Sequence, residues 1–248
     1  MASVSGFQRA RRPEQVRARR EAILDTATAM LRQRPVADIS LRELSDRVGL
    51  AKSNVLRYFD SREAIFLEVL DREWTAWLDD MDDRLPANTA RHHATGRDTA
   101  GHNAGGRDAG DTSRTEGVAR IVADTLVERP LLCELISAMA GVLERNISLE
   151  FARDFKRRAT VNADRLAGLV RSGLPRLPPA AAEQFAAAVF VIVAGLWPYA
   201  NPTDAVATAM AEHGSPPPMR MFADGLADGL ANQLVGLVVR TATPDLPT

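Results

Sequence analysis

The residues best suited to chemistry in this 248-residue chain lie between positions 40 and 62. One short stretch offers an ammonium, a hydroxyl, an amide and a guanidinium from Lys52, Ser53, Asn54 and Arg57. Arginine can donate two hydrogen bonds to a guanine edge and asparagine can pair with an adenine edge, whereas charged and hydroxyl groups also suit phosphate oxygens. We therefore predict base contacts from Ser53, Asn54 and Arg57. We predict phosphate contacts from a second set: Ser40, Arg42, Lys52, Tyr58 and Arg62.

The surrounding sequence contains the signals needed to hold these groups in place. Ser40 is a good helix N-cap, and Glu43 three residues later completes a capping box. Gly49 tolerates the left-handed conformation that ends a helix sharply. The pattern predicts a helix up to Val48, a turn, and a second helix over about 51–59. This is a helix-turn-helix whose second helix would enter a DNA major groove. The alternative is a helical hairpin whose polar face is simply solvated.

The exit from the second helix carries a family resemblance. The stretch Lys52-Ser53-Asn54-Val55-Leu56-Arg57-Tyr58-Phe59-Asp60-Ser61-Arg62-Glu63 resembles the signature of the tetracycline-repressor (TetR) family of transcriptional regulators, close to Lys-x-x-x-Tyr-x-Tyr-Phe-x-Ser-Lys-Glu. Leu56 stands where an aromatic residue is usual, and Arg62 stands where a lysine is usual. The resemblance covers residues 17 to 70 closely and is architectural beyond them. It implies a homodimer that binds an operator and responds to a small ligand.

Charge is unevenly distributed along the chain. Residues 1–65 carry 13 Arg and Lys against 8 Asp and Glu, whereas the remainder carries 18 against 24. A basic first quarter on an acidic body suggests a polyanion partner at the N-terminal end. Arginines at positions 9, 11, 12, 17, 19 and 20 could follow phosphates. The alternatives are a chance division of charge and a solvated tail.

The periodicity of apolar residues predicts an all-α fold of about nine helices. A three-helix DNA-binding head is followed by a larger helical body for ligand binding and dimerisation. We place a mobile basic arm at 1–16, the helix-turn-helix domain at 17–62, the body at 63–240 and a tail at 241–248. Within the body, helices are expected over about 116–128, 130–145, 148–172, 179–197 and 219–240, with a further short helix over 204–212.

Residues 86–117 contain no Leu, Ile, Val, Met or Phe. Such a segment cannot bury apolar area to offset its chain entropy, so we expect a disordered insertion. It holds His92, His93 and His102, which we interpret as solvated rather than as a metal site. We predict no metal and no cofactor. Cys133 is the only cysteine and lies in an apolar run, which indicates a core residue and a reducing, cytoplasmic location.

The segment 185–197 is apolar on nearly every side, and such a helix must be covered on every side. We expect helices 179–197 and 219–240 of two chains to form a four-helix bundle, although they could also complete the core of a monomer. The segment is too short to span a membrane and is followed by Pro198. An apolar or amphipathic effector would contact a pocket lined by Trp77, Leu135, Met139, Phe155, Asn162, Phe190 and Trp197.

The sequence therefore favours a sequence-specific DNA-binding regulator, and we predict a repressor that leaves its operator when a small ligand binds. Two alternatives remain: an activator of the same fold, and a helical interaction protein that does not read DNA. Enzyme motifs are absent from the sequence: it has no nucleophile triad with supporting motifs, no phosphate-binding glycine loop and no zinc spacing.

Overall fold

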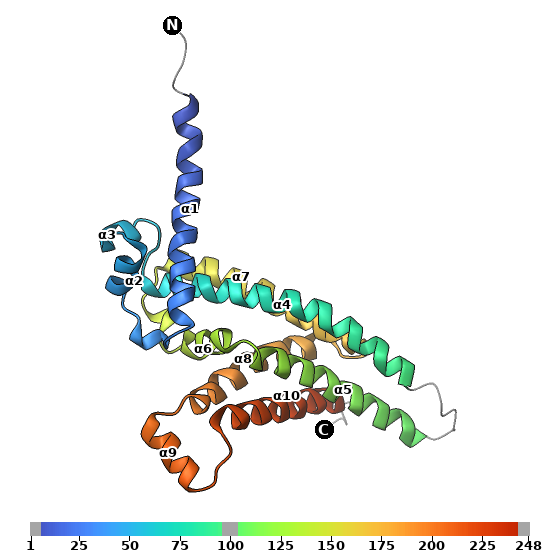
Figure 1. The fold of residues 1–248 in the computed structure, drawn as a ribbon. Helices are drawn as coiled ribbons and strands as arrows, with labels where there is room; N and C mark the ends of the chain where they lie inside the picture. Colours follow the sequence, from blue (N-terminus) through green and yellow to red (C-terminus); the bar gives the residue numbers. More distant parts are fainter. Residues whose placement is uncertain (1–5, 96–103, 243–248) are drawn as a thin grey trace. The chain divides into compact units, whose positions relative to one another are not determined.

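The structure is a computed structural model that describes the backbone of residues 6–95 and 104–242, and the side chains of residues 13–85 and 112–241. This part of the chain holds ten α-helices, two short 3-10 helices and no strand (Figure 1). The predicted all-α fold is therefore confirmed, and the tenth α-helix, Asp204–Glu212, is the further short helix expected over 204–212. The chain divides into two compact units. Unit 1 comprises Met1–Arg72 and Ala138–Lys156, and unit 2 comprises Glu73–Ser137 and Arg157–Thr248.

Unit 1 contains the predicted head. Its helices are α1 (Gly6–Leu31), α2 (Leu41–Val48), α3 (Lys52–Val55) and the first turns of α4 (Arg62–Thr95). A 3-10 turn, Val36–Asp38, links α1 to α2. Apolar side chains spaced for one helical face meet in a common core, including Ile23, Leu24, Leu44, Val55, Phe59 and Phe66, all at most 5% exposed. Burial of these side chains fixes how α1, α2, α3 and the first turns of α4 pack together.

The ends of α2 form as predicted, with one difference. The Glu43 amide donates to the Ser40 hydroxyl at 3.2 Å, so Ser40 is the N-cap. Gly49 has φ +72° and ψ +32°, and its amide donates to the Asp46 carbonyl at 3.1 Å. The Glu43 carboxylate, which a full capping box would direct back to Ser40, pairs instead with Arg34. A charged partner stabilises a carboxylate more than the neutral amide does.

The second helix is shorter than predicted. We expected it to span 51–59, whereas α3 covers only Lys52–Val55. Beyond Val55 the backbone hydrogen bonds are mixed: Arg57 donates to Asn54 and Tyr58 to Val55, both i→i−3, and Phe59 donates to Val55, i→i−4. The chain therefore remains coiled as far as Phe59, but as a tighter turn that is not regular α-helix. We call residues 52–59 the recognition turn.

Unit 2 is built from helices α5 (Ala104–Val127), α8 (Pro179–Ala200), α9 (Asp204–Glu212) and α10 (Pro218–Ala242), together with α6 (Pro130–Met139) as far as Ser137. Most of α4 and of α7 (Leu149–Gly173) also belongs to this unit. Helices α8 and α10 pack side by side (Figure 1), because glycines on α10 admit α8 side chains. A Cβ at Gly229 would lie 3.4 Å from Ile192, and one at Gly225 would lie 3.7 Å from Leu196.

Other boundaries differ from the prediction. Helix α1 begins at Gly6 within the segment we expected to be a mobile arm, and α4 and α5 extend to Thr95 and from Ala104 into the insertion that we expected to be disordered. Residues 96–103, including His102, lie outside the described residues. Once a packed segment has nucleated a helix, each added residue costs little, and Ala and Arg extend helices well.

Two further boundaries in the body also differ. Helix α6 ends at Met139 rather than near Arg145, because a 3-10 turn, Leu143–Arg145, takes over. Helix α8 continues through Pro198 to Ala200. With 22 residues and a mean hydropathy of 1.7, α8 is the one described helix long and apolar enough to cross a membrane, although we predicted none. Length and composition are weak evidence here, since core helices of soluble proteins share both.

Cys133 is fully buried on α6, as expected for a core residue. Its thiol donates to the Leu126 carbonyl at 3.4 Å. Burial raises the pKa of this thiol to about 12, because the thiolate would lose its hydration. The thiol therefore stays protonated and poorly nucleophilic near neutral pH.

Replacing Gly49 with alanine should destabilise unit 1 by about 1–2 kcal/mol, because an L-residue in the left-handed region is strained. Steric overlap is not the cause, since a Cβ at this position meets nothing within 4 Å. Urea unfolding followed by circular dichroism measures the effect. Gly141→Ala is the matched control, because a Cβ there also meets nothing within 4 Å and no positive φ is found. Equal destabilisation by both substitutions would contradict this explanation.

Candidate nucleic-acid interface

The recognition turn separates its apolar side chains from its polar ones. Val55 and Phe59 are buried at 0% and 5% exposure and hold the turn against unit 1. The four groups with the predicted chemistry, Lys52, Ser53, Asn54 and Arg57, are all exposed. The two base-reading candidates with the clearest code, Asn54 and Arg57, therefore face solvent and are available to a partner. Actual DNA contact by these residues stays a prediction.

Most basic side chains of residues 17–72 fall into two groups. Those that are engaged within the protein have carboxylate partners: Arg20, Arg34, Arg62 and Arg72. Those without an ion-pair partner among the described residues are exposed: Arg17, Arg19, Arg42, Arg47, Lys52 and Arg57. Burying or pairing a cation removes it from the surface field, so only the second group offers charge to an external polyanion.

Arg20 anchors the recognition turn. Its guanidinium donates to the Tyr58 carbonyl and to both carboxylate oxygens of Glu68, the longer of the two bonds to Glu68 being 2.7 Å. It also lies 4.2 Å from the centre of the Phe59 ring, within cation–π range. This single side chain of α1 therefore joins the recognition turn to α4. The sequence grouped it with the phosphate-contact candidates, and its anchoring role becomes visible only in the fold.

Two of the predicted phosphate contacts already have structural tasks. The guanidinium of Arg62 donates to the Ile39 carbonyl at 2.8 Å and to Glu63 at 3.0 Å. Glu63 in turn accepts from the Asn146 amide at 3.0 Å, so Arg62 belongs to a bracing network. The Ser40 hydroxyl caps α2. By contrast, Arg42 is exposed and without an ion-pair partner among the described residues. The structure thus gives Arg62 and Ser40 roles that compete with phosphate binding.

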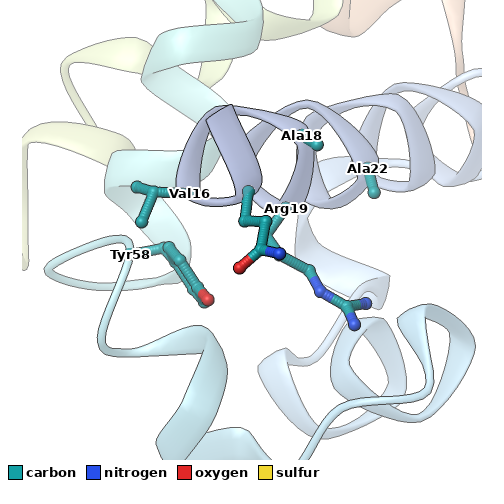
Figure 2. Close-up of a pocket in the computed structure, with 6 residues that line it drawn as sticks. Val16, Ala18, Arg19, Ala22 and Tyr58 are labelled. Atoms are coloured by element: carbon teal, nitrogen blue, oxygen red, sulfur yellow. The ribbon is translucent and has the colours of Figure 1, made fainter. Parts of the chain in front are cut away.

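Tyr58 is half-buried and lies at the edge of a groove that the sequence did not indicate. The groove has a volume of about 550 Å³ and is formed by Tyr58 together with residues of α1: Gln15, Val16, Ala18, Arg19 and Ala22. In Figure 2 the Tyr58 ring and the Arg19 side chain extend into the same space from two different elements. We call this the α1 groove.

The predicted effector-contact residues do not all belong to one unit. Met139 and Phe155 fall in unit 1, whereas the other five fall in unit 2: Trp77, Leu135, Asn162, Phe190 and Trp197. Trp77 is fully buried and donates to the Thr125 hydroxyl at 2.9 Å, so its polar atom is already satisfied. The Trp197 indole donates to Glu134 at 2.8 Å, and its ring meets Phe222 edge-on at 5.1 Å. Leu135 and Phe155 are buried core residues.

The predicted effector-contact set left out Trp74 and Glu134, which both lie in unit 2. The Trp74 ring lies 4.2 Å from the Phe190 ring, and its indole N–H is buried with no acceptor among the described residues. Glu134 could have been noticed as a single charge within the apolar run Leu131–Ile136. Nothing in the sequence distinguishes Trp74 from Trp77, because both fit the same helical face.

Comparisons with known proteins agree with this architecture. A family model described as the tetracyclin repressor-like C-terminal domain matches residues 71–241, and a model described as bacterial regulatory proteins of the tetR family matches residues 23–69. The HTH-type transcriptional regulator EthR of Mycobacterium tuberculosis is 45% identical over 51 residues. That match covers 21% of this chain and 24% of EthR, so the chain matches about a quarter of the length of this curated relative.

Two solved structures resemble most of the chain in fold. A TetR transcriptional regulator from Rhodococcus sp. RHA1 has a TM-score of 0.50 and 14% identity, covering 92% of this chain and 98% of its own. Thermus thermophilus FadR, a TetR family repressor solved with lauroyl-CoA, has a TM-score of 0.51 and 16% identity, with the same coverage. At these identities the likeness concerns the fold alone.

Replacing Arg20 with alanine should destabilise unit 1 by about 1–3 kcal/mol, because it leaves Glu68 and the Tyr58 carbonyl without their charged donor. Arg19→Ala is the matched control: it removes an adjacent, exposed arginine and should change stability by no more than about 0.5 kcal/mol. Urea unfolding of both variants measures the difference. Indistinguishable unfolding midpoints would show that the Arg20 contacts contribute nothing to the anchor.

Proposed function

We propose that this chain, which belongs to the tetracyclin repressor-like (TetR) family of bacterial regulatory proteins, binds an operator duplex in sequence-specific fashion and represses transcription until a small ligand releases it. The observation that carries this proposal is the exposed set Lys52, Asn54 and Arg57 on a turn that Val55, Phe59 and Arg20 hold in place. A segment that reads bases needs a fixed backbone and exposed polar side chains, and the recognition turn has both. The cytoplasm is the compartment that fits such a regulator.

Roles for the exposed groups follow from their chemistry. Arg57 would chelate a guanine edge and Asn54 an adenine edge, with Ser53 as a shorter donor beside them. Lys52, Arg42 and Tyr58 would contact phosphates and set the register of the turn on the duplex. Since the Arg62 guanidinium and Ser40 hydroxyl are engaged within the protein, we assign them bracing roles first and phosphate contact second.

A homodimer would supply the second reading element. Four exposed residues of α8 are spaced four apart and so form one face of the helix: Ala187, Val191, Gly195 and Tyr199. Val191 and Tyr199 are 73% and 71% exposed, which is unusual for large apolar side chains on a long apolar helix. A second copy of α8 and α10 would cover this face in a four-helix bundle. The two reading elements would then meet half-sites about 34–36 Å apart.

An effector site in unit 2 would explain the buried indole N–H of Trp74. An unsatisfied buried donor costs about 1–3 kcal/mol, and an oxygen of a bound ligand would remove that cost. The Trp74–Phe190 pair and Trp197 would provide apolar contact, and Glu134 a polar one. These groups suit an amphipathic compound with a carbonyl or hydroxyl oxygen. Lauroyl-CoA is a reasonable first compound to try, because the similarly folded Thermus thermophilus FadR was solved with it.

A gel shift tests the DNA-binding proposal and separates it from a helical interaction protein. The probe is the duplex upstream of the protein's own gene, with a scrambled duplex of equal composition as control, at two salt concentrations. Preference for the promoter duplex supports the proposal. Equal affinity for both duplexes, or no binding, would contradict it. A reporter gene under the same promoter then distinguishes repression from activation.

Arg57→Ala and Lys52→Ala should fail in different ways. The first should lower discrimination at one base position in each half-site by about 1–3 kcal/mol, because alanine cannot form the bidentate bond to a base. The second should weaken binding to every sequence and flatten log K against log salt by about 0.9 for each phosphate that is no longer neutralised. Anisotropy titrations with single-base variants of the operator, repeated at several salt concentrations, measure both. An unchanged salt slope for Lys52→Ala would refute its phosphate role.

Val191→Glu should dissociate the dimer, because it would place an unpaired carboxylate in an apolar interface. Sedimentation velocity should show at least about tenfold weaker association, corresponding to about 1.4 kcal/mol or more. Val161→Glu is the matched control, since Val161 is also a highly exposed valine in unit 2, at 62%, but on α7. If both variants remained dimeric, α8 would not form the interface.

A further inference from the structure

One apolar side chain of the recognition turn lies outside the protein core. Leu56 is 41% exposed, whereas the preceding residue, Val55, is fully buried. Leu56 is the C-cap of α3, with φ −66° and ψ −5°, and its amide donates to the Lys52 carbonyl at 3.1 Å. The backbone of Leu56 is therefore held by the turn while a large part of its side chain remains in water.

The exposed side of the recognition turn continues from its polar residues onto Leu56. Because the Leu56 amide bonds to Lys52, four residues earlier, helical spacing holds over this turn. Residues three and four apart then lie on the same side, which places Leu56 beside Ser53 and Lys52. Both are exposed, as is Arg57, which follows Leu56 in the chain. A partner that contacts Ser53 and Arg57 therefore meets Leu56 as well.

The chemistry of leucine limits what Leu56 can contact favourably. Its side chain has no hydrogen-bond donor or acceptor, so neither a phosphate nor a polar base edge can bond to it. A polar edge placed against it would lose water without gaining a hydrogen bond, which costs free energy. Contact with an apolar group instead removes the apolar surface of both groups from water. Leu56 therefore favours an apolar group and disfavours a polar one.

A DNA duplex offers such a group on its major-groove base edges. Adenine, guanine and cytosine present hydrogen-bond donors and acceptors there, whereas thymine adds its 5-methyl group. Asn54 and Arg57, on either side of Leu56 in the chain, are the residues proposed above to meet base edges in this groove. The thymine methyl is therefore the base-specific group that matches the side chain of Leu56.

We propose that Leu56 is a specificity-determining residue that recognises one thymine in each half-site through the 5-methyl group of that base. The inference rests on the proposed DNA-binding function. It adds an apolar contact to the hydrogen bonds proposed for Asn54 and Arg57, so that the turn reads bases by two kinds of chemistry. Cytosine at the same position would present its amino group and no methyl, and Leu56 would select against it.

Replacement of single thymines by uracil tests the contact, because uracil lacks the methyl and keeps every hydrogen-bonding group of thymine. Each thymine of the promoter duplex is replaced in turn, and the full-length protein is titrated with every duplex by anisotropy. At one thymine in each half-site the unaltered protein should bind the uracil duplex with a Kd about two- to fivefold higher, since one methyl is no longer buried. At the same position 5-bromouracil should restore the affinity, because bromine has nearly the size of a methyl group and is apolar.

Leu56→Ala should bind the thymine and uracil duplexes equally at that position. Its salt slope should match that of the unaltered protein, because the substitution removes no charge. Leu56→Met, which keeps an apolar side chain of similar size, should retain the preference for thymine. Leu149→Ala is the matched control, since Leu149 is also an exposed leucine of unit 1, at 65%, but lies on α7. Urea unfolding should give Leu56→Ala the midpoint of the unaltered protein, which excludes loss of fold as the cause.

The outcomes separate this inference from the proposed function. If no uracil replacement weakened the unaltered protein, or if Leu56→Ala kept the same preference for thymine, the inference would fail. Uniform weakening of Leu56→Ala on every duplex would also overturn it, because it would indicate contact with deoxyribose, which is the same at every base. In each of these cases a preference of the unaltered protein for the promoter over the scrambled duplex would leave the proposed function standing. Without that preference, the proposed function itself would fail.

Discussion

The interface depends on the attachment of a very short helix to its surroundings. Helix α3 is four residues long, and a single helical turn has no stability of its own in water. Its orientation comes from contacts made by other elements: Val55 and Phe59 buried in the core, and Arg20 of α1 bonded to the Tyr58 carbonyl while paired with Glu68 of α4. A side chain that is to read a base must start from a fixed backbone position, and in this protein tertiary contacts fix the backbone of the recognition turn.

The same constraint explains how the arginines of unit 1 are divided. Arg20, Arg34 and Arg62 hold elements together through carboxylates and backbone carbonyls. Arg19 and Arg57, each adjacent or close in sequence to an anchoring group, remain exposed. A basic N-terminal region therefore performs two tasks, because its paired cations build the scaffold and its unpaired cations create the field that a polyanion would meet.

Unit 2 combines a packed apolar core with groups that have no partner within the described residues: an exposed face of α8 and the indole N–H of Trp74. Small residues on α10 let α8 approach closely, while an exposed stripe on α8 remains for another surface. Of the three tryptophans, two have their indole N–H bonded to side-chain acceptors and the third, Trp74, has no acceptor among the described residues. Core packing, the proposed self-association and the proposed effector binding would thus use different faces of the same helices.

The sequence alone determined the all-α fold, the position of the turn, and the polar set Lys52, Ser53, Asn54 and Arg57 that faces a partner or solvent, because N-caps, Gly49 and apolar spacing act over a few residues. Tertiary structure decided the rest. The length of α3, the extent of α1, α4 and α5, and the roles of Arg20 and Arg62 depend on contacts such as Arg20–Glu68, between residues 48 positions apart. The sequence does not distinguish the neighbouring Arg19 and Arg20. In the fold Arg20 pairs with Glu68 whereas Arg19 lines the α1 groove, because pairing depends on proximity in space.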